Sequence, residues 1–132
     1  MTPDSSAIVA AFGPWHALHG RAVEALREVR DLVAHAELEA YSVLTRLPAP
    51  FRVDPNLAAE YLSKRFGGSR LALPPRERTR FVERISGLRI TGGRVYDALI
   101  AATAANRDLT LVTCDRRATS VYENVGVGYE LL

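Results

Sequence analysis

Four carboxylates interrupt or border the most apolar stretches of this 132-residue chain: Asp4, Glu39, Asp97 and Asp115. An ionised carboxylate in apolar surroundings is costly unless something compensates its charge. The other acidic residues lie mostly on arginine-rich, turn-like or helix-surface segments, where solvation explains them. Hard divalent cations bind carboxylate oxygens. If the fold brings the four together, a bound divalent cation is the compensation that we expect.

Each of the four also has a simpler interpretation. Asp4 fits an N-cap, Asp97 fits the dipole of a helix start, and Asp115 fits a turn after a strand. Glu39 lies two residues from Glu37, and a helix places these two side chains on different faces, so only one of them points inward. Residue by residue these interpretations stay open, and only a shared location favours a common site.

Length and composition indicate one domain, over residues 1–132. No apolar run approaches the length of about 18 residues that a membrane span needs, and the amino terminus lacks the pattern of a secretory signal. The single cysteine, Cys114, cannot form an intrachain disulfide, and we expect it to pack in the core. These features predict a cytoplasmic protein without a membrane segment.

The charge pattern is compatible with nucleic acid without requiring it. The formal net charge is only +2. All but one of the cationic residues are arginines, which bind phosphate through a bidentate fork and stack on bases. Most of them are nevertheless expected to be solvated surface residues.

Strand and helix patterns alternate along the chain. After a stub of strand before Asp4, the patterns predict helices over 7–12, 15–29, 37–47, 55–66, 76–85 and 94–107, a helical turn over 117–122, and strands over 31–36, 70–73, 88–91, 109–114 and 127–132. Such alternation implies an α/β fold with a mainly parallel central sheet between helices, a three-layer α/β/α sandwich.

In this architecture ligands gather outside the carboxyl ends of the strands. Asp4 and Asp115 directly follow predicted strands. Glu39 and Asp97 lie in the first turns of helices that follow strands. All four carboxylates are therefore predicted to reach the same edge of the sheet, although they come from distant parts of the sequence.

The same segments resemble the PIN-domain family, and more closely its VapC ribonuclease toxins. The resemblance is carried by Asp-Ser-Ser from residue 4, Glu39 within AHAELEAY, Asp97 within GGRVYDALIAATA and Asp115 at the end of LVTCD. It covers nearly the whole chain in order. It implies an α/β/α sandwich, an endoribonuclease that depends on Mg²⁺ or Mn²⁺, a homodimer, and inhibition by a small cognate antitoxin protein.

The chain departs from the family pattern at its start. Only three residues precede Asp4, one of them Pro3, which cannot donate a hydrogen bond to a sheet. The family's usual Asp-Thr-Ser also reads Asp-Ser-Ser, although Ser5 retains a hydroxyl. Either the first strand is unusually short or the start of the chain is trimmed.

Hydrolysis of a phosphodiester needs a nucleophilic water and neutralised phosphoryl charge, both of which a divalent metal can supply. Because Mg²⁺ keeps several waters, one or two direct carboxylates are expected. Asp4 and Asp115 are the predicted direct ligands. Asp97 is expected to belong to the metal site through a metal-bound water. Glu39 and Asp97 hold metal-bound waters or orient the water that attacks the phosphorus.

Other side chains are predicted to support this chemistry. Ser6 and Thr113 are candidates for hydrogen bonds to the carboxylates, although Thr113 also fits an ordinary strand position. Arg94, Arg116 and Arg117 lie close in sequence to proposed ligands, so they are the candidates for RNA binding. The expected substrate is an unstacked loop of a structured RNA such as tRNA or ribosomal RNA.

Two other functions and one protein-binding surface are alternatives that parts of the sequence suggest. A receiver-like signalling domain would need a lysine at the end of a late strand, but the only lysine, Lys64, lies on a predicted helix. A PIN-like binding module without catalysis is disfavoured by the four intact acids. The tracts 15–29 and 55–66 contain apolar anchors for a protein partner, or they are core. No spacing of His16, His19 and His35 indicates metal binding, so they are expected to be structural or surface residues.

Overall fold

The computed structural model describes residues 1–132, and its strands are short and parallel. They are β1 (Thr2–Pro3), β2 (Leu32–Val33), β3 (Arg70–Leu71), β4 (Leu111–Thr113) and β5 (Tyr129–Leu131). One sheet has the order β1-β4-β5, and β2 pairs with β3 in a second. β1 lies beside β2, so the two sheets are neighbours, although no strand ladder joins them. All pairs are parallel, with Thr2 opposite Leu111 and Leu32 opposite Arg70.

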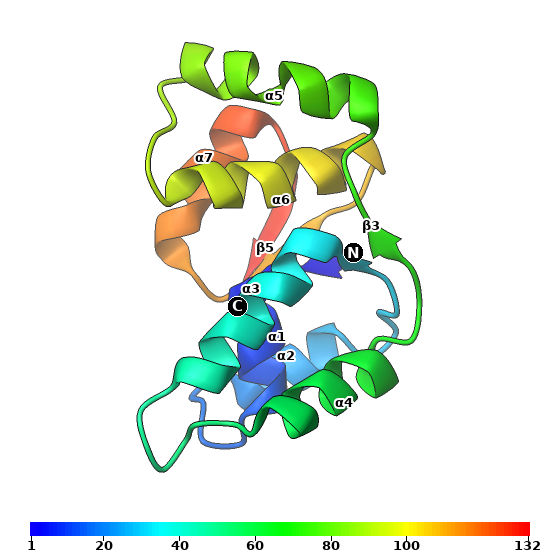
Figure 1. The fold of residues 1–132 in the computed structure, drawn as a ribbon, viewed down its shortest axis with the longest axis vertical. Helices are drawn as coiled ribbons and strands as arrows, with labels where there is room; N and C mark the ends of the chain where they lie inside the picture. Colours follow the sequence, from blue (N-terminus) through cyan, green and yellow to red (C-terminus); the bar gives the residue numbers. More distant parts are fainter.

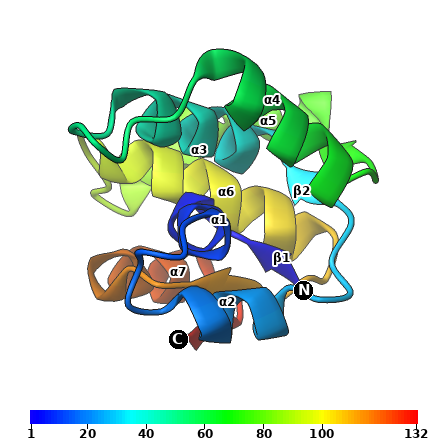
Figure 2. The same cartoon turned by 90° about the horizontal axis from the view of Figure 1, so that it is seen from below.

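Seven α-helices surround the strands. They are α1 (Ser5–Phe12), α2 (His19–Ala25), α3 (Ala34–Arg46), α4 (Pro55–Arg65), α5 (Pro75–Gly87), α6 (Arg94–Asn106) and α7 (Thr119–Val125), with a 3₁₀ turn η1 (Arg116–Ala118) before α7. In Figure 2, β1 lies between helices α3, α4 and α6 on one side and helices α2 and α7 on the other. The predicted α/β sandwich with a parallel sheet is confirmed (Figure 1).

The predicted strand over 88–91 is wrong. The residues after α5 instead cap the end of that helix. Leu88 N–H donates to the Arg84 carbonyl, and Ile90 N–H donates to the Ile85 carbonyl at 3.0 Å. Arg89 has a φ of 60°, a left-handed conformation that no strand contains. Because the helix end uses these backbone donors, the segment cannot join a sheet.

Two predicted helices begin at other residues. The helix predicted over 15–29 is confined to α2, because the segment before it forms turns in which His16 N–H donates to Gly13 and His19 N–H donates to His16. The predicted strand over 31–36 ends at Val33, and α3 begins directly at Ala34 rather than at residue 37. Glu39 consequently lies in the second turn of α3.

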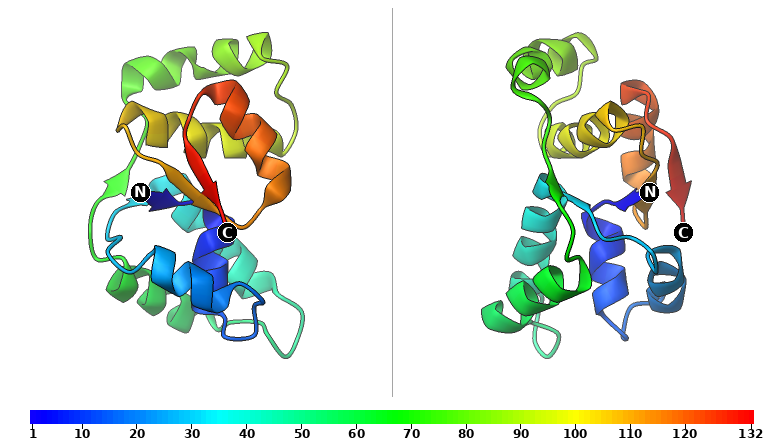
Figure 3. Two further views of the ribbon diagram at one scale, coloured as in Figure 1. Left: turned by 180° about the vertical axis from the view of Figure 1, so that it is seen from behind. Right: turned by 90° about the vertical axis from the view of Figure 1, so that its right-hand side faces the viewer.

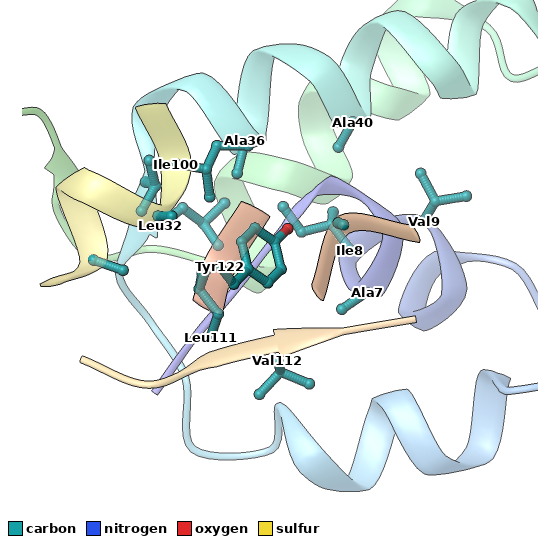
Figure 4. Close-up of a cluster of buried hydrophobic side chains, with 14 of the residues drawn as sticks. Ala7, Ile8, Val9, Leu32, Ala36, Ala40, Ile100, Leu111, Val112 and Tyr122 are labelled. Atoms are coloured by element: carbon teal, nitrogen blue, oxygen red, sulfur yellow. The ribbon is translucent and has the colours of Figure 1, made fainter. Parts of the chain in front are cut away.

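One hydrophobic core joins the layers. Tyr122 is fully buried in it, and Figure 4 shows its ring among Ile8, Leu32 and Leu111. Cys114 is half-buried and packs against this core, as predicted. Figure 3 shows that the amino terminus at β1 and the carboxyl terminus after β5 both lie at the sheet. The core therefore ties the first residues of the chain to the last.

Candidate active site

Asp4 lies where β1 ends and α1 begins. Its backbone N–H donates to the Val112 carbonyl at 3.0 Å, which holds it beside β4. It caps α1, because Oδ1 accepts hydrogen bonds from Ala7 N–H at 3.1 Å and from Ser6 Oγ at 2.6 Å. The side chain is buried, and this burial raises its pKa although its hydrogen-bond donors oppose the rise. The N-cap interpretation of Asp4 is thus correct, and it holds the carboxylate in one place.

The second oxygen of Asp4 has a partner from the far end of the chain. Tyr122 on α7 donates its hydroxyl to Asp4 Oδ2 at 2.6 Å. Burial and the nearby Asp4 charge raise the pKa of Tyr122, so the phenol keeps its proton and remains a donor. Three hydrogen bonds therefore orient Asp4, and a carboxylate with about four lone-pair sites can still make one further contact.

Ser6 and Thr113 connect Asp4 to the end of β4. Cys114 N–H donates to Ser6 Oγ at 2.8 Å, and the Ser6 and Thr113 hydroxyl oxygens lie 3.3 Å apart. Thr113 Oγ1 also accepts from Asp115 N–H at 3.0 Å. The two hydroxyls thus connect the backbone at Asp4 to the backbone at Asp115. Ser6 and Thr113 are the two supporting residues that the sequence predicts.

Asp115 is more exposed than Asp4 and Glu39. It follows β4 and caps η1, with Oδ1 accepting from Arg117 N–H at 2.9 Å. The Arg117 guanidinium lies 3.6 Å from the same oxygen and is exposed. Asp115 therefore serves as a turn residue and still faces solvent beside a cation.

Glu39 and Asp97 complete the cluster from α3 and α6. Burial, followed by the negative charges of Glu39, Asp4 and Asp115, raises the pKa of Asp97 to about 6, against the effect of Arg94. Burial and Asp4 raise the pKa of Glu39, whereas Arg46 opposes the rise. The structure thus brings all four predicted carboxylates within one electrostatic environment. Asp4 and Asp115 reach it from the ends of β1 and β4, as predicted, whereas α6 brings Asp97 there without the strand predicted before it.

The donor set fits a hard cation that keeps part of its water shell. No group of three His, Cys, Asp or Glu side chains is arranged to hold a metal ion directly. Such a cation needs only one or two direct carboxylates. Glu39 Oε1 is buried without a hydrogen-bond partner, and the negative charges of Glu39, Asp4 and Asp115 around Asp97 outweigh the opposing charge of Arg94. These uncompensated groups are the observation that fits a divalent ion.

Glu37 points elsewhere. It forms an ion pair with Arg70, whose guanidinium also donates to the Phe66 carbonyl at 2.7 Å. Only Glu39 faces the cluster. Helical spacing predicts that just one of the two glutamates points inward, and the family resemblance identifies it as Glu39.

Tyr122 and His35 were missed as site residues. No local pattern relates residue 122 to residue 4, so Tyr122 had no detectable signal. His35 lies one helical turn before Glu39, and its Nε2 is 3.7 Å from Glu39 Oε1. That spacing of four residues was a signal, although it indicates proximity rather than a role.

The hydroxyl of Tyr122 is expected to stabilise the fold. Tyr122→Phe leaves Asp4 Oδ2 buried without its donor, so the free energy of unfolding should fall by about 1–3 kcal/mol. Urea unfolding at pH 7 measures this change. The matched control is Tyr129→Phe, since Tyr129 donates to Glu123 at 2.6 Å in an exposed pair. Equal losses in the two variants would contradict the assigned role of Tyr122.

Comparison with known proteins agrees with this geometry. Residues 1–124 match the family described as PIN domain, so the chain belongs to the PIN-domain family. Within it the chain is of the VapC type. Ribonuclease VapC40 of Mycobacterium tuberculosis is 40% identical over 132 residues, 100% of this chain and 98% of that protein. Ribonuclease VapC27 of the same species is 40% identical over 126 residues, 94% and 90% of the two chains.

Two solved structures share the fold at lower identity. The crystal structure of FitAcB from Neisseria gonorrhoeae has a TM-score of 0.70 and 20% identity, covering 97% of this chain and 94% of that one. FitAB bound to an IR36 DNA fragment has a TM-score of 0.67 and 18% identity, with coverages of 98% and 93%. None of this chain's helices has the length and apolar character that crossing a membrane requires.

Proposed function

We propose that this protein is a metal-dependent endoribonuclease that hydrolyses RNA phosphodiester bonds and acts as the toxin of a toxin–antitoxin pair. The observation that carries the proposal is the convergence of four carboxylates, whose mutual repulsion contributes to a pKa of about 6 at Asp97. The names of the curated relatives, both ribonucleases of the VapC group, support it. Membership of the PIN-domain family excludes a receiver-like domain.

Asp4, Asp97 and Asp115 would hold Mg²⁺ or Mn²⁺. When bound, the ion supplies positive charge for the phosphoryl oxygens and makes a water nucleophilic at neutral pH. Asp4 contributes a carboxylate that three hydrogen bonds keep in place. Glu39 and Asp97 orient the attacking water, because Glu39 Oε1 has no partner in the protein and is free to accept from it.

RNA approaches a negatively charged site only if cations flank it. Arg94, Arg116 and Arg117 are exposed next to the carboxylates and are proposed to contact the phosphates. The proposed substrate is an unstacked loop in a structured RNA such as tRNA or ribosomal RNA, because bases in a loop are accessible to side chains.

A small cognate antitoxin is the proposed protein partner, and a homodimer is the proposed assembly. Trp15, 42% exposed, packs against the Phe51 ring, and Leu57 on α4 is exposed. Between α3 and α4 lies a groove of about 660 Å³, lined in part by Leu38, Tyr41 and Leu62. These apolar anchors suit an interface in the cytoplasm. Purification of the toxin with its operon partner should yield a complex, and recovery of the toxin alone would contradict the partner proposal.

A cleavage assay tests the proposed activity. Purified protein should cut structured and single-stranded RNA in Mg²⁺ or Mn²⁺, lose this activity in EDTA and regain it when metal is restored. Asp97→Asn, purified identically, controls for contaminating ribonuclease. Cleavage that persists in EDTA would contradict the metal dependence, and absence of cleavage on both RNA classes would overturn the proposed function.

A further inference from the structure

A depression beside the carboxylate cluster is not explained by the hydrolytic chemistry. It measures about 370 Å³ and lies between α3 and the start of α6. Its walls include His35, Glu39, Ser42 and Arg46 from α3 and Tyr96 from α6. Since Glu39 belongs both to this wall and to the cluster, a ligand in the depression would adjoin the reacting phosphate.

The depression contains an aromatic pair. The rings of His35 and Tyr96 are stacked, with centroids 5.2 Å apart and planes 11° from parallel. His35 covers one face of the Tyr96 ring, yet Tyr96 remains 51% exposed. This ring directly precedes Asp97 in sequence, so the fold presents a flat aromatic surface to solvent at the edge of the site.

Exposed polar and charged groups surround the pair. His35 Nε2 and Glu39 Oε1 are buried 3.7 Å from each other, whereas Ser42 is exposed on the same wall of the depression. Arg46 is exposed and close enough to Glu39 for its charge to oppose the rise of the glutamate's pKa. An occupant is therefore expected to combine a flat ring, polar edges and a negative charge.

We propose that Tyr96, supported by His35, is a stacking platform for one nucleobase of the RNA substrate, and that Arg46 contacts an adjoining phosphate. A nucleotide combines all three properties, and stacking on an aromatic ring tolerates any base because every base has a π-face. This inference rests on the proposed ribonuclease function and adds to it a substrate subsite on the Glu39 side of the cluster.

The test compares Tyr96→Ala with Tyr96→Phe. Binding of a fluorescein-labelled single-stranded RNA is measured by anisotropy in EDTA, and cleavage of the same RNA is measured in Mn²⁺. Tyr96→Ala should raise both Kd and KM by about tenfold, the size expected for the loss of one base stack. Its kcat should stay near that of the wild type, because stacking acts equally before and during reaction. Tyr96→Phe should retain the wild-type Kd and KM.

Val82→Ala is the control. Val82 is 63% exposed on α5 and lies outside the depression. It should leave Kd and KM unchanged. Melting curves verify that each variant is folded.

Each result decides between the two proposals. If the wild type cleaves RNA but Tyr96→Ala has the same Kd and KM, the platform is overturned and the ribonuclease function stands. A loss of kcat at unchanged KM would also overturn it, since Tyr96 would then act through Asp97. If the wild type neither binds nor cleaves RNA, both proposals fail.

Discussion

Asp97→Asn and Asp115→Asn are each expected to lower RNA cleavage in Mn²⁺ by at least about 100-fold, because groups of one metal site act as a unit. Asn has nearly the shape of Asp but lacks the negative charge that attracts a hard cation. Asp4→Asn should have a similar effect, and so should Glu39→Gln. Initial rates at saturating RNA measure the change, with melting curves to show that each variant is folded.

The matched control is Glu37→Gln. Glu37 lies on the same helix as Glu39 but pairs with Arg70 outside the cluster. Its substitution should leave the cleavage rate within about twofold of the wild type, an estimate for a residue without a role in the transition state. Near-normal cleavage by Asp97→Asn or Asp115→Asn would remove that residue from the catalytic set.

The second large effect concerns stability without metal. A carboxyl whose pKa is higher in the folded than in the unfolded state makes its full contribution to stability at pH values below its unfolded pKa. That contribution to stability is lost as the pH rises through the folded pKa. For Asp97 the window runs from 3.8 to about 6. In EDTA, Asp97→Asn and the wild type should therefore be similarly stable at pH 4. Above pH 6 the variant should be more stable by about 1 kcal/mol, a figure reduced for the solvent screening of a half-buried group.

Metal is expected to reverse this order. A ligand that binds only the folded state stabilises it by about 2.7 kcal/mol at a hundredfold excess over Kd, and the wild type should gain more of this than the variant. Thermal melts of both proteins at pH 7, in EDTA and in Mn²⁺, make the measurement. If Asp97 only favoured the dipole of α6, Asn would instead lower stability by about 0.3–1 kcal/mol in both conditions. Equal metal-induced shifts would therefore exclude Asp97 from the metal site.

Much of the architecture was predictable because local chemistry marks the ends of elements. Asp54 and Pro55 start α4, Gly13 ends α1, and the alternation of elements indicates a parallel sheet. The positions of Asp4 and Asp115 followed from that alternation, because parallel strands bring their carboxyl ends together, whereas the strand predicted before Asp97 does not exist. The error over 88–91 arose because an apolar and polar alternation resembles a strand, whereas the end of α5 captures those backbone donors.

The long-range partners of the site could not be predicted in the same way. The Tyr122 hydroxyl reaches Asp4 across 118 positions, and nothing near either residue specifies that contact. The stack of His35 on Tyr96 likewise depends on how α3 and α6 are arranged. Spacing within a helix shows which residues share a face, but only packing shows what that face meets.

The order in which this chain is synthesised has a consequence for the parallel pairing of β1 with β4. Thr2 leaves the ribosome early, yet its partner Leu111 is made more than a hundred residues later. At about 5–20 residues per second, that interval lasts roughly 5 to 20 seconds. Tyr122, which anchors Asp4, is made later still. We therefore expect Asp4 to lack both its strand partner and its buried hydroxyl donor until most of this domain has been synthesised, so that the acidic cluster is among the last parts of the fold to assemble.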